Sequence, residues 1–303
     1  MKRDDSGKSA RVRASLAALA RRKGINLELL LVRYTLERLL YRLGQSKFRE
    51  RFILKGAMLQ TVWLTDPFRP TRDLDLLGFG ESDIESIKST FSEILSVADD
   101  DGIVFDIESL SVETIRQETE YGGLRLETTA QLAGARVKVQ IDIGFGDAVT
   151  PDAAEIEYPV LLDSPAPRIR AYPKETVVAE KLEAIISLGA TNGRMKDFYD
   201  LWMMSRHFEF DGAALTKATA ATFSRRNTPL PAEIPVGLSQ EFAADPDANR
   251  RWGFFTTRNV LSENPGTFAE VIGVLREFLM PIVRGAARSA APPDKWQPGG
   301  PWA

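Results

Sequence analysis

The stretch Arg72-Asp73-Leu74-Asp75-Leu76-Leu77 places two carboxylates two residues apart inside an apolar run. Successive side chains of a β-strand point to opposite faces, so the pattern predicts a strand with Asp73 and Asp75 on one face and leucines on the other. Two adjacent carboxylates repel each other unless a positive charge lies between them, and a divalent cation with oxygen ligands meets that need. The alternative is a strand end with two solvated acids, and the spacing alone does not decide between them.

Length and composition set broad limits. The chain has 303 residues, enough for two domains or one large one, with 44% hydrophobic and 27% charged residues. It contains no cysteine, which excludes disulfides, a thiolate nucleophile and cysteine-based metal sites. No apolar run approaches about 18 residues, so we expect a cytoplasmic protein with no membrane partner. The net charge of −3 disfavours broad nucleic-acid binding but permits a local basic patch.

The chain divides where its composition changes. Proline-rich sequence over 158–173 separates an α/β half from a helical half. We therefore expect an α/β domain over 1–168 and an α-helical domain over 169–285. The charged residues 1–9 are expected to be disordered, and the Ala-, Pro- and Gly-rich residues 286–303 to form a flexible tail.

Hydrophobic periodicity predicts the elements of the first half. Gly134 marks the turn of an expected hairpin. The expected strands cover 103–110, 122–130 and 136–143, and the expected helices cover 10–23, 27–43, 57–64 and 82–97. The two prolines of the loop 65–71 are expected to exclude helix and to bring Arg69 and Arg72 close to the two acids.

Asp142 offers a third carboxylate. It lies on the polar face of the expected strand 136–143, near the end of that strand. If this strand neighbours the one that carries Asp73 and Asp75, the three acids share one surface and suit the cations of a phosphoryl transfer. The alternative is an antiparallel sheet with one solvated face.

Lys181 is the most unusual residue of the helical half. In the predicted helix 174–188 it falls on the apolar arc, between Val177 and Ile185. A lysine in that position must extend its ammonium out to solvent or meet an anion. Asp197 and Asp200 follow on the next predicted helix, 195–208. Asp197 can simply answer the helix dipole. Asp200 lies deeper among apolar residues, where it can meet Lys181, as an ion pair or as part of a site.

Five blocks of sequence, in this order, resemble the nucleotidyltransferase fold related to DNA polymerase β. More narrowly, the chain is similar to the AbiEii/MenT-type toxins of bacterial toxin–antitoxin systems over residues 50 to 205. The blocks are Leu54-Lys55-Gly56, Arg69-Pro70-Thr71-Arg72-Asp73-Leu74-Asp75-Leu76, Ile141-Asp142-Ile143-Gly144-Phe145-Gly146-Asp147, Val178-Ala179-Glu180-Lys181-Leu182-Glu183-Ala184-Ile185 and Lys196-Asp197-Phe198-Tyr199-Asp200-Leu201.

The resemblance implies a fold and a set of site residues. The fold would be α+β, with a nucleotidyltransferase-like mixed sheet flanked by helices and an α-helical C-terminal domain. Catalytic residues would be Asp73 and Asp75, which hold Mg²⁺ (with Mn²⁺ as the alternative), Lys181 on the triphosphate, and Asp200 as a base or an aid to Lys181. Asp142 matches the third acid of the wider superfamily. The nucleotide-binding set would be Lys55, Gly56, Arg69, Thr71, Arg72 and Lys181. One departure is Ala57, where the superfamily often has glycine or a small polar residue.

The resemblance also implies an activity. A nucleoside triphosphate (NTP) would donate its nucleoside monophosphate to tRNA 3′ ends and so block translation, and an adjacent gene would encode an antitoxin partner. Two alternatives stay open: transfer of a nucleotide or phosphate to a protein hydroxyl or an aminoglycoside-type small molecule, and a non-catalytic nucleotide-binding module. Five arginines could hold RNA phosphates or simply be solvated: Arg225, Arg226, Arg250, Arg251 and Arg258.

Overall fold

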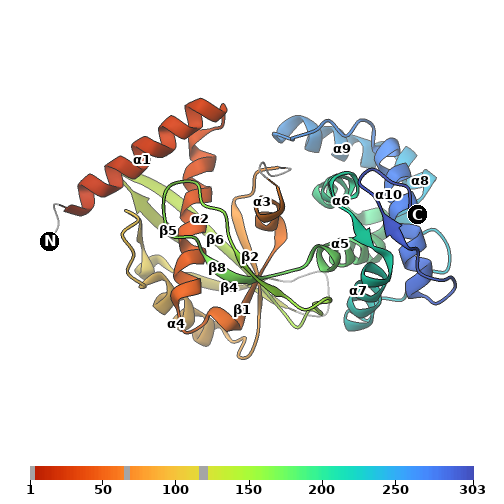
Figure 1. Ribbon diagram of the computed structural model, residues 1–303, viewed down its shortest axis with the longest axis horizontal. Helices are drawn as coiled ribbons and strands as arrows, with labels where there is room; N and C mark the ends of the chain where they lie inside the picture. The colour runs from red at the N-terminus through yellow and green to blue at the C-terminus, as the bar shows by residue number, and fades with distance from the viewer. Residues whose placement is uncertain (1–3, 65–68, 116–121) are drawn as a thin grey trace. The chain divides into compact units, whose positions relative to one another are not determined.

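The computed structural model describes residues 4–64, 69–115 and 122–303, so part of the expected loop 65–71 lies outside the described residues. Contacts between residues divide the chain into two compact units (Figure 1). The first unit comprises residues 1–65, 70–146 and 154–171. The second comprises 172–303 together with two short segments, 66–69 and 147–153.

The first unit is built on an eight-stranded sheet, and this sheet is mixed, as the resemblance implied. Its order is β3-β5-β6-β2-β1-β8-β7, and β4 pairs with β5. The β2–β6 and β1–β8 pairs are parallel, and the other pairs are antiparallel. The strands are β1 (Phe52–Lys55), β2 (Asp73–Gly78), β3 (Val104–Phe105), β4 (Ser111–Ile115), β5 (Gly123–Leu132), β6 (Ala135–Phe145), β7 (Ala154–Glu157) and β8 (Arg168–Ala171).

The β5–β6 hairpin turns where the sequence predicted. Ala133 and Gly134 both have positive φ, 46° and 78°, which is the conformation of a tight two-residue hairpin turn. β6 then continues to Phe145, beyond the predicted end at 143, because it pairs with β5 on one side and β2 on the other. Asp142 therefore lies inside the strand, three residues before its end, and not at its end.

Helices of the first unit pack on this sheet. α2 contacts β6 and β8, and α4 contacts β4. The helices are α1 (Asp4–Lys23), α2 (Leu27–Gln45), α3 (Gln60–Trp63), which follows a 3₁₀ turn over Gly56–Leu59, and α4 (Ile84–Leu95).

Two expectations for the first unit are wrong. Of the residues 1–9 that were expected to be disordered, 1–3 lie outside the described residues and 4–9 are helical; Ser9 is buried and its hydroxyl accepts a 2.6 Å hydrogen bond from the backbone N–H of Ala133. The strand expected over 103–110 is interrupted, since the Asp106 side chain accepts from the N–H of Ser109 and holds a 3₁₀ turn there. Such local side-chain bonds compete with a strand ladder.

The second unit is mainly helical. Its core contains Phe268, whose ring centroid lies 5.2 Å from that of Phe198, 5.6 Å from that of Phe242 and 5.3 Å from that of Trp252. The elements are α5 (Lys174–Leu188), α6 (Met195–His207), β9 (Phe210–Asp211), α7 (Gly212–Arg225), α8 (Gln240–Ala244), α9 (Pro246–Arg258), α10 (Phe268–Ala286) and β10 (Lys295–Trp296). None of the helices in the described part of the chain is long and apolar enough to cross a membrane.

Residues 286–303 do not form the expected flexible tail. β10 pairs antiparallel with β9, and Trp296 is buried with its indole N–H donating to the carbonyl of Ser205 at 2.6 Å. The ring of Trp302 stacks on Phe278 at 5.9 Å between centroids. Two large aromatic side chains bury enough apolar area to hold a segment whose average composition favours disorder.

Candidate active site

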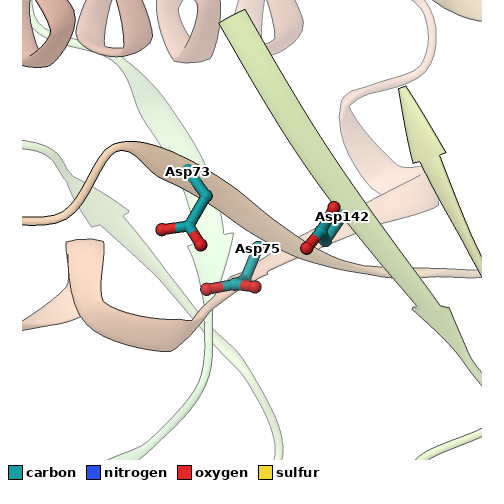
Figure 2. A group of neighbouring side chains, drawn as sticks. All are labelled: Asp73, Asp75 and Asp142. Atoms are coloured by element: carbon teal, nitrogen blue, oxygen red, sulfur yellow. The ribbon is translucent and has the colours of Figure 1, made fainter. Parts of the chain in front are cut away.

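Three carboxylates gather on one face of the sheet in the first unit (Figure 2). Asp73 and Asp75 come from β2 and Asp142 from β6, and the parallel register places Asp75 directly beside Asp142. One oxygen of each residue lies within 4.8 Å of the others. All three side chains are half-buried, while Leu74 and Leu76 are fully buried. This confirms the predicted alternation and brings the third acid to the same surface.

Gly56 follows β1, the strand on the other side of β2. Its φ is +74°, and a Cβ at this position would lie 2.0 Å from Oδ2 of Asp75. Only glycine tolerates both the backbone conformation and so close an approach. The resemblance implied that this glycine binds the nucleotide; the structure shows its close approach to Asp75.

Of the two residues just before β2, Thr71 contacts the acid cluster and Arg72 is paired elsewhere. The hydroxyl of Thr71 donates to Oδ1 of Asp73 and so helps to fix that carboxylate. Arg72 pairs with Glu28 of α2 at 2.8 Å, and both side chains are exposed. The alternation that brings Asp73 and Asp75 to one face directs the preceding arginine to the other. The expected approach of Arg72 to the acids is therefore not what the structure shows.

Asp142 has a partner that the sequence analysis missed. The guanidinium of Arg125 on β5 donates two hydrogen bonds to Asp142, each 2.8 Å long. These bonds raise the pKa of Arg125 above its ordinary value. The hairpin turn contained the signal, because counting back along both strands from Ala133 and Gly134 sets Arg125 opposite Asp142.

The second unit holds a cluster of opposite charges around Lys181. Its ammonium donates to Oδ1 of Asp197 at 2.6 Å and to Oδ2 of Asp200 at 2.9 Å. Arg69, which belongs to this unit, donates to both oxygens of Asp200 at 2.9 and 3.0 Å. Arg194 lies 2.7 Å from Oδ2 of Asp197. The predicted meeting of Lys181 with Asp200 is confirmed, and Asp197 does more than answer the dipole of its helix.

Burial and charge act in opposite directions on these groups. Burial by itself would lower the pKa of Lys181, but Asp197 and Asp200 outweigh it, so the pKa is raised. Burial would raise the pKa of Asp200, but Lys181 and Arg69 outweigh it, so the pKa is lowered. Asp200 is therefore ionised, 1% exposed and fully hydrogen-bonded, which makes it a poor proton acceptor and a good support for Lys181.

One arginine that was a candidate for RNA phosphates is already engaged. The guanidinium of Arg226 donates to Asp147 at 2.9 Å and to Glu183 at 2.7 Å, and its side chain is 11% exposed. Burial by itself would lower its pKa, but Glu180, Asp147 and Glu183 outweigh it, so the pKa is raised. Arg226 is part of the interior of the second unit and neither holds RNA phosphates nor is simply solvated, which corrects both alternatives that the sequence left open for it.

The remaining predicted residue, Lys55, ends β1 and pairs in register with Asp75. The sequence-predicted set thus falls into two groups, each within one unit. Lys55, Gly56, Thr71, Arg72 and the three acids belong to the first unit, and Arg69, Lys181 and Asp200 belong to the second.

The sequence and the fold are similar to those of known proteins. Residues 38–274 match the model of the family described as nucleotidyl transferase AbiEii toxin, type IV toxin–antitoxin system. No curated protein sequence gives a match. A crystal structure of a protein from H. pylori described as a nucleotidyltransferase is 15% identical, with 88% of this chain and 99% of that chain covered and a TM-score of 0.52, which shows a shared fold. JHP933 from Helicobacter pylori is 15% identical over 84% of this chain and 92% of its own, with a TM-score of 0.48. Because the family model covers most of its length, the chain belongs to the AbiEii nucleotidyltransferase toxin family of type IV toxin–antitoxin systems.

Proposed function

We propose that the protein uses Mg²⁺ to transfer a nucleoside monophosphate from an NTP to the 3′ end of tRNA. The observation that carries this proposal is the cluster of Asp73, Asp75 and Asp142, in a chain of this nucleotidyltransferase family. Blocked tRNA ends would stop aminoacylation and arrest growth. The proposed partner that relieves this is an antitoxin from an adjacent gene, and the proposed place of action is the cytoplasm.

The donor set fits a hard cation. All three groups are carboxylates, and oxygen ligands suit Mg²⁺ or Mn²⁺, whereas no sulfur or imidazole is among them. A bound divalent cation would lower the pKa of the acceptor hydroxyl and neutralise charge on the phosphates. Asp73 and Asp75 are the proposed ligands. Asp142 is the third proposed ligand; its oxygens accept from Arg125 at 2.8 Å and, more weakly, from the amide of Gln140 at 3.4 and 3.5 Å, and a cation would replace these longer bonds from Gln140.

The basic residues are proposed to act on the triphosphate. Lys181 is held as an ammonium by Asp197 and Asp200, and an ammonium is a compact partner for phosphate oxygens. Lys55 and Arg69 would add further positive charge, and Thr71 would keep Asp73 in place. Arg72 is given no contact with the triphosphate, because it pairs with Glu28 on the face away from the acids.

The proposed reaction is a displacement at the α-phosphorus. The acceptor hydroxyl oxygen forms a bond to this phosphorus, the bond between the α-phosphorus and the bridging oxygen breaks, and pyrophosphate leaves. The hydroxyl proton passes to solvent, because both oxygens of Asp142 already accept from the guanidinium of Arg125. Asp200 is not assigned this role, since Lys181 and Arg69 occupy its oxygens and its pKa is lowered.

A labelling experiment tests the proposal. Purified protein is incubated with each NTP, labelled at the α- or the γ-phosphate, with tRNA and either Mg²⁺ or EDTA. We expect α-label on tRNA with Mg²⁺ only. Transfer of the γ-label would indicate a phosphotransferase in place of a nucleotidyltransferase. Label on the protein, or on an added aminoglycoside, would indicate that the acceptor is not tRNA. Absence of transfer from every NTP to every acceptor would refute it.

A further inference from the structure

A second candidate site lies entirely within the second unit. A pocket of about 510 Å³ is formed where the start of α6 faces the end of α9. Its lining includes the cations Arg69, Arg194, Lys196 and Arg251 and the aromatic residues Phe254 and Phe255. No carboxylate is among the described residues that line it. A pocket with this composition attracts an anion that also carries a flat apolar group.

The positive charge of the pocket is only partly balanced. Arg69 and Arg194 are paired with Asp200 and Asp197, whereas Lys196 is exposed at the N-terminal turn of α6, where the helix dipole adds positive potential. The Nε atom of Arg251 is buried and has no hydrogen-bond partner within the described part of the chain. A buried donor without a partner is costly unless a ligand satisfies it.

The two phenylalanines differ in their surroundings. Phe255 is held between Tyr199 and Trp252, with centroid distances of 5.8 and 5.6 Å. Phe254 is 55% exposed, and the guanidinium of Arg258 lies 5.4 Å from its ring centroid. An exposed ring beside cations is the combination with which proteins stack bases and hold the backbone of single-stranded nucleic acids.

We propose that this pocket binds an unpaired nucleotide of the acceptor strand, with its base on Phe254 and its phosphodiester on Arg251 and Lys196. This inference rests on one part of the proposed function, namely that the acceptor is a nucleic acid. Two features favour a strand over free NTP. The pocket is open to solvent, so a chain can continue past it, and its described lining holds no carboxylate that could share a divalent cation with a triphosphate.

The test measures binding without turnover. Full-length protein is titrated into a fluorescein-labelled single-stranded RNA of about ten nucleotides, long enough to occupy one site of this kind. Arg251→Gln and Phe254→Ala should each weaken RNA binding about tenfold, since one stacked base or one ionic contact is worth that much. Arg251→Gln should also reduce the slope of log affinity against log salt by about 0.7, the value of one phosphate contact. NTP binding, measured by calorimetry, should not change.

Arg250→Gln is the matched control. It removes the same charge from the next residue of α9, but Arg250 pairs with Asp247 and does not line the pocket. It should bind RNA like the unaltered protein. Thermal unfolding checks that each variant folds, and Phe254→Ala removes an exposed ring, which provides a second variant if Arg251→Gln does not fold.

Three results would overturn the inference. The first is that the unaltered protein does not bind RNA. The second is that both pocket variants bind RNA as the unaltered protein does. The third is that the pocket variants lose NTP binding and keep RNA binding, which would assign the pocket to the triphosphate. Failure of the proposed function has a different signature. RNA would then bind through Arg251 and Phe254 while no α-label reached tRNA in the transfer assay.

Discussion

Asp75 lies against the backbone of Gly56 so closely that a methyl group at residue 56 would come within 2.0 Å of the Asp75 carboxylate. Gly56 ends the strand pairing of β1, in which Lys55 is the register partner of Asp75. The position of this proposed metal ligand therefore depends on the absence of a side chain at the residue that follows the neighbouring strand. A glycine that looks like a phosphate-binding residue in the sequence also shapes the acid cluster.

Gly56→Ala should displace Asp75 and abolish nucleotide transfer. It should also lower the free energy of unfolding by about 1–3 kcal/mol, because alanine is strained at positive φ and the methyl group meets the carboxylate. Transfer assays and urea unfolding measure the two effects. Gly80→Ala is the control, since Gly80 has φ +80° but a Cβ there meets nothing within 4 Å. If both variants lose stability but keep their transfer activity, the contact between Gly56 and Asp75 is not needed for nucleotide transfer.

Asp75→Asn should remove the response to metal without loss of fold stability. The amide keeps the shape of the side chain but removes one of the mutually repelling charges near Asp73 and Asp142. Mg²⁺ should raise the unfolding temperature of the unaltered protein by binding the native state and leave that of the variant unchanged. Differential scanning calorimetry with and without MgCl₂ measures this. An equal upward shift in both proteins would place the cation elsewhere.

The faces of the acids were predictable because their signals are local, whereas the pairing of β2 with β6 that brings Asp142 to the cluster remained a condition in the sequence. Alternation along β2 set the face of Asp73 and Asp75, and the turn at Gly134 was enough to define the β5–β6 hairpin. The pairing of Arg125 with Asp142 could have been read by extending that register. The partner of Arg72 could not, because Glu28 lies on a helix whose packing depends on the whole sheet.

The ends of the chain were predicted worst, for a related reason. Average composition suggests disorder for 286–303, but Trp296 and Trp302 hold this segment by contacts with residues distant in sequence, Ser205 and Phe278. Likewise Ser9 is fixed by Ala133. Composition reports whether a segment could fold alone, and these segments depend on surfaces built by the rest of the chain.

Lys181→Met should prevent transfer and also destabilise the second unit. Asp197 and Asp200 would lose their shared cation in a buried setting, and breaking a buried ion pair costs about 3–5 kcal/mol. Lys181→Met with Asp197→Asn restores the charge balance around Arg69 and Asp200, so it should recover part of the stability but none of the activity. Urea unfolding and the labelled transfer assay separate the two effects. Transfer by either variant at the normal rate would reduce Lys181 to a structural role.

Glu37 should make the stability of the first unit depend on pH. Its carboxylate on α2 is fully buried, accepts a 2.8 Å hydrogen bond from the N–H of Leu161 and lies 3.8 Å from the guanidinium of Arg38. Burial raises its pKa from 4.5 to about 7. Between these values the native state binds a proton that the unfolded state releases, so the free energy of unfolding falls as pH rises, by about 3 kcal/mol in total by pH 8. Glu37→Gln keeps an acceptor for Leu161 and cannot ionise, so it should gain stability relative to the unaltered protein from pH 5 to pH 8. Urea unfolding at both pH values measures this difference, in which the other titrating groups cancel. A difference that does not change with pH would show that Glu37 titrates near its ordinary value.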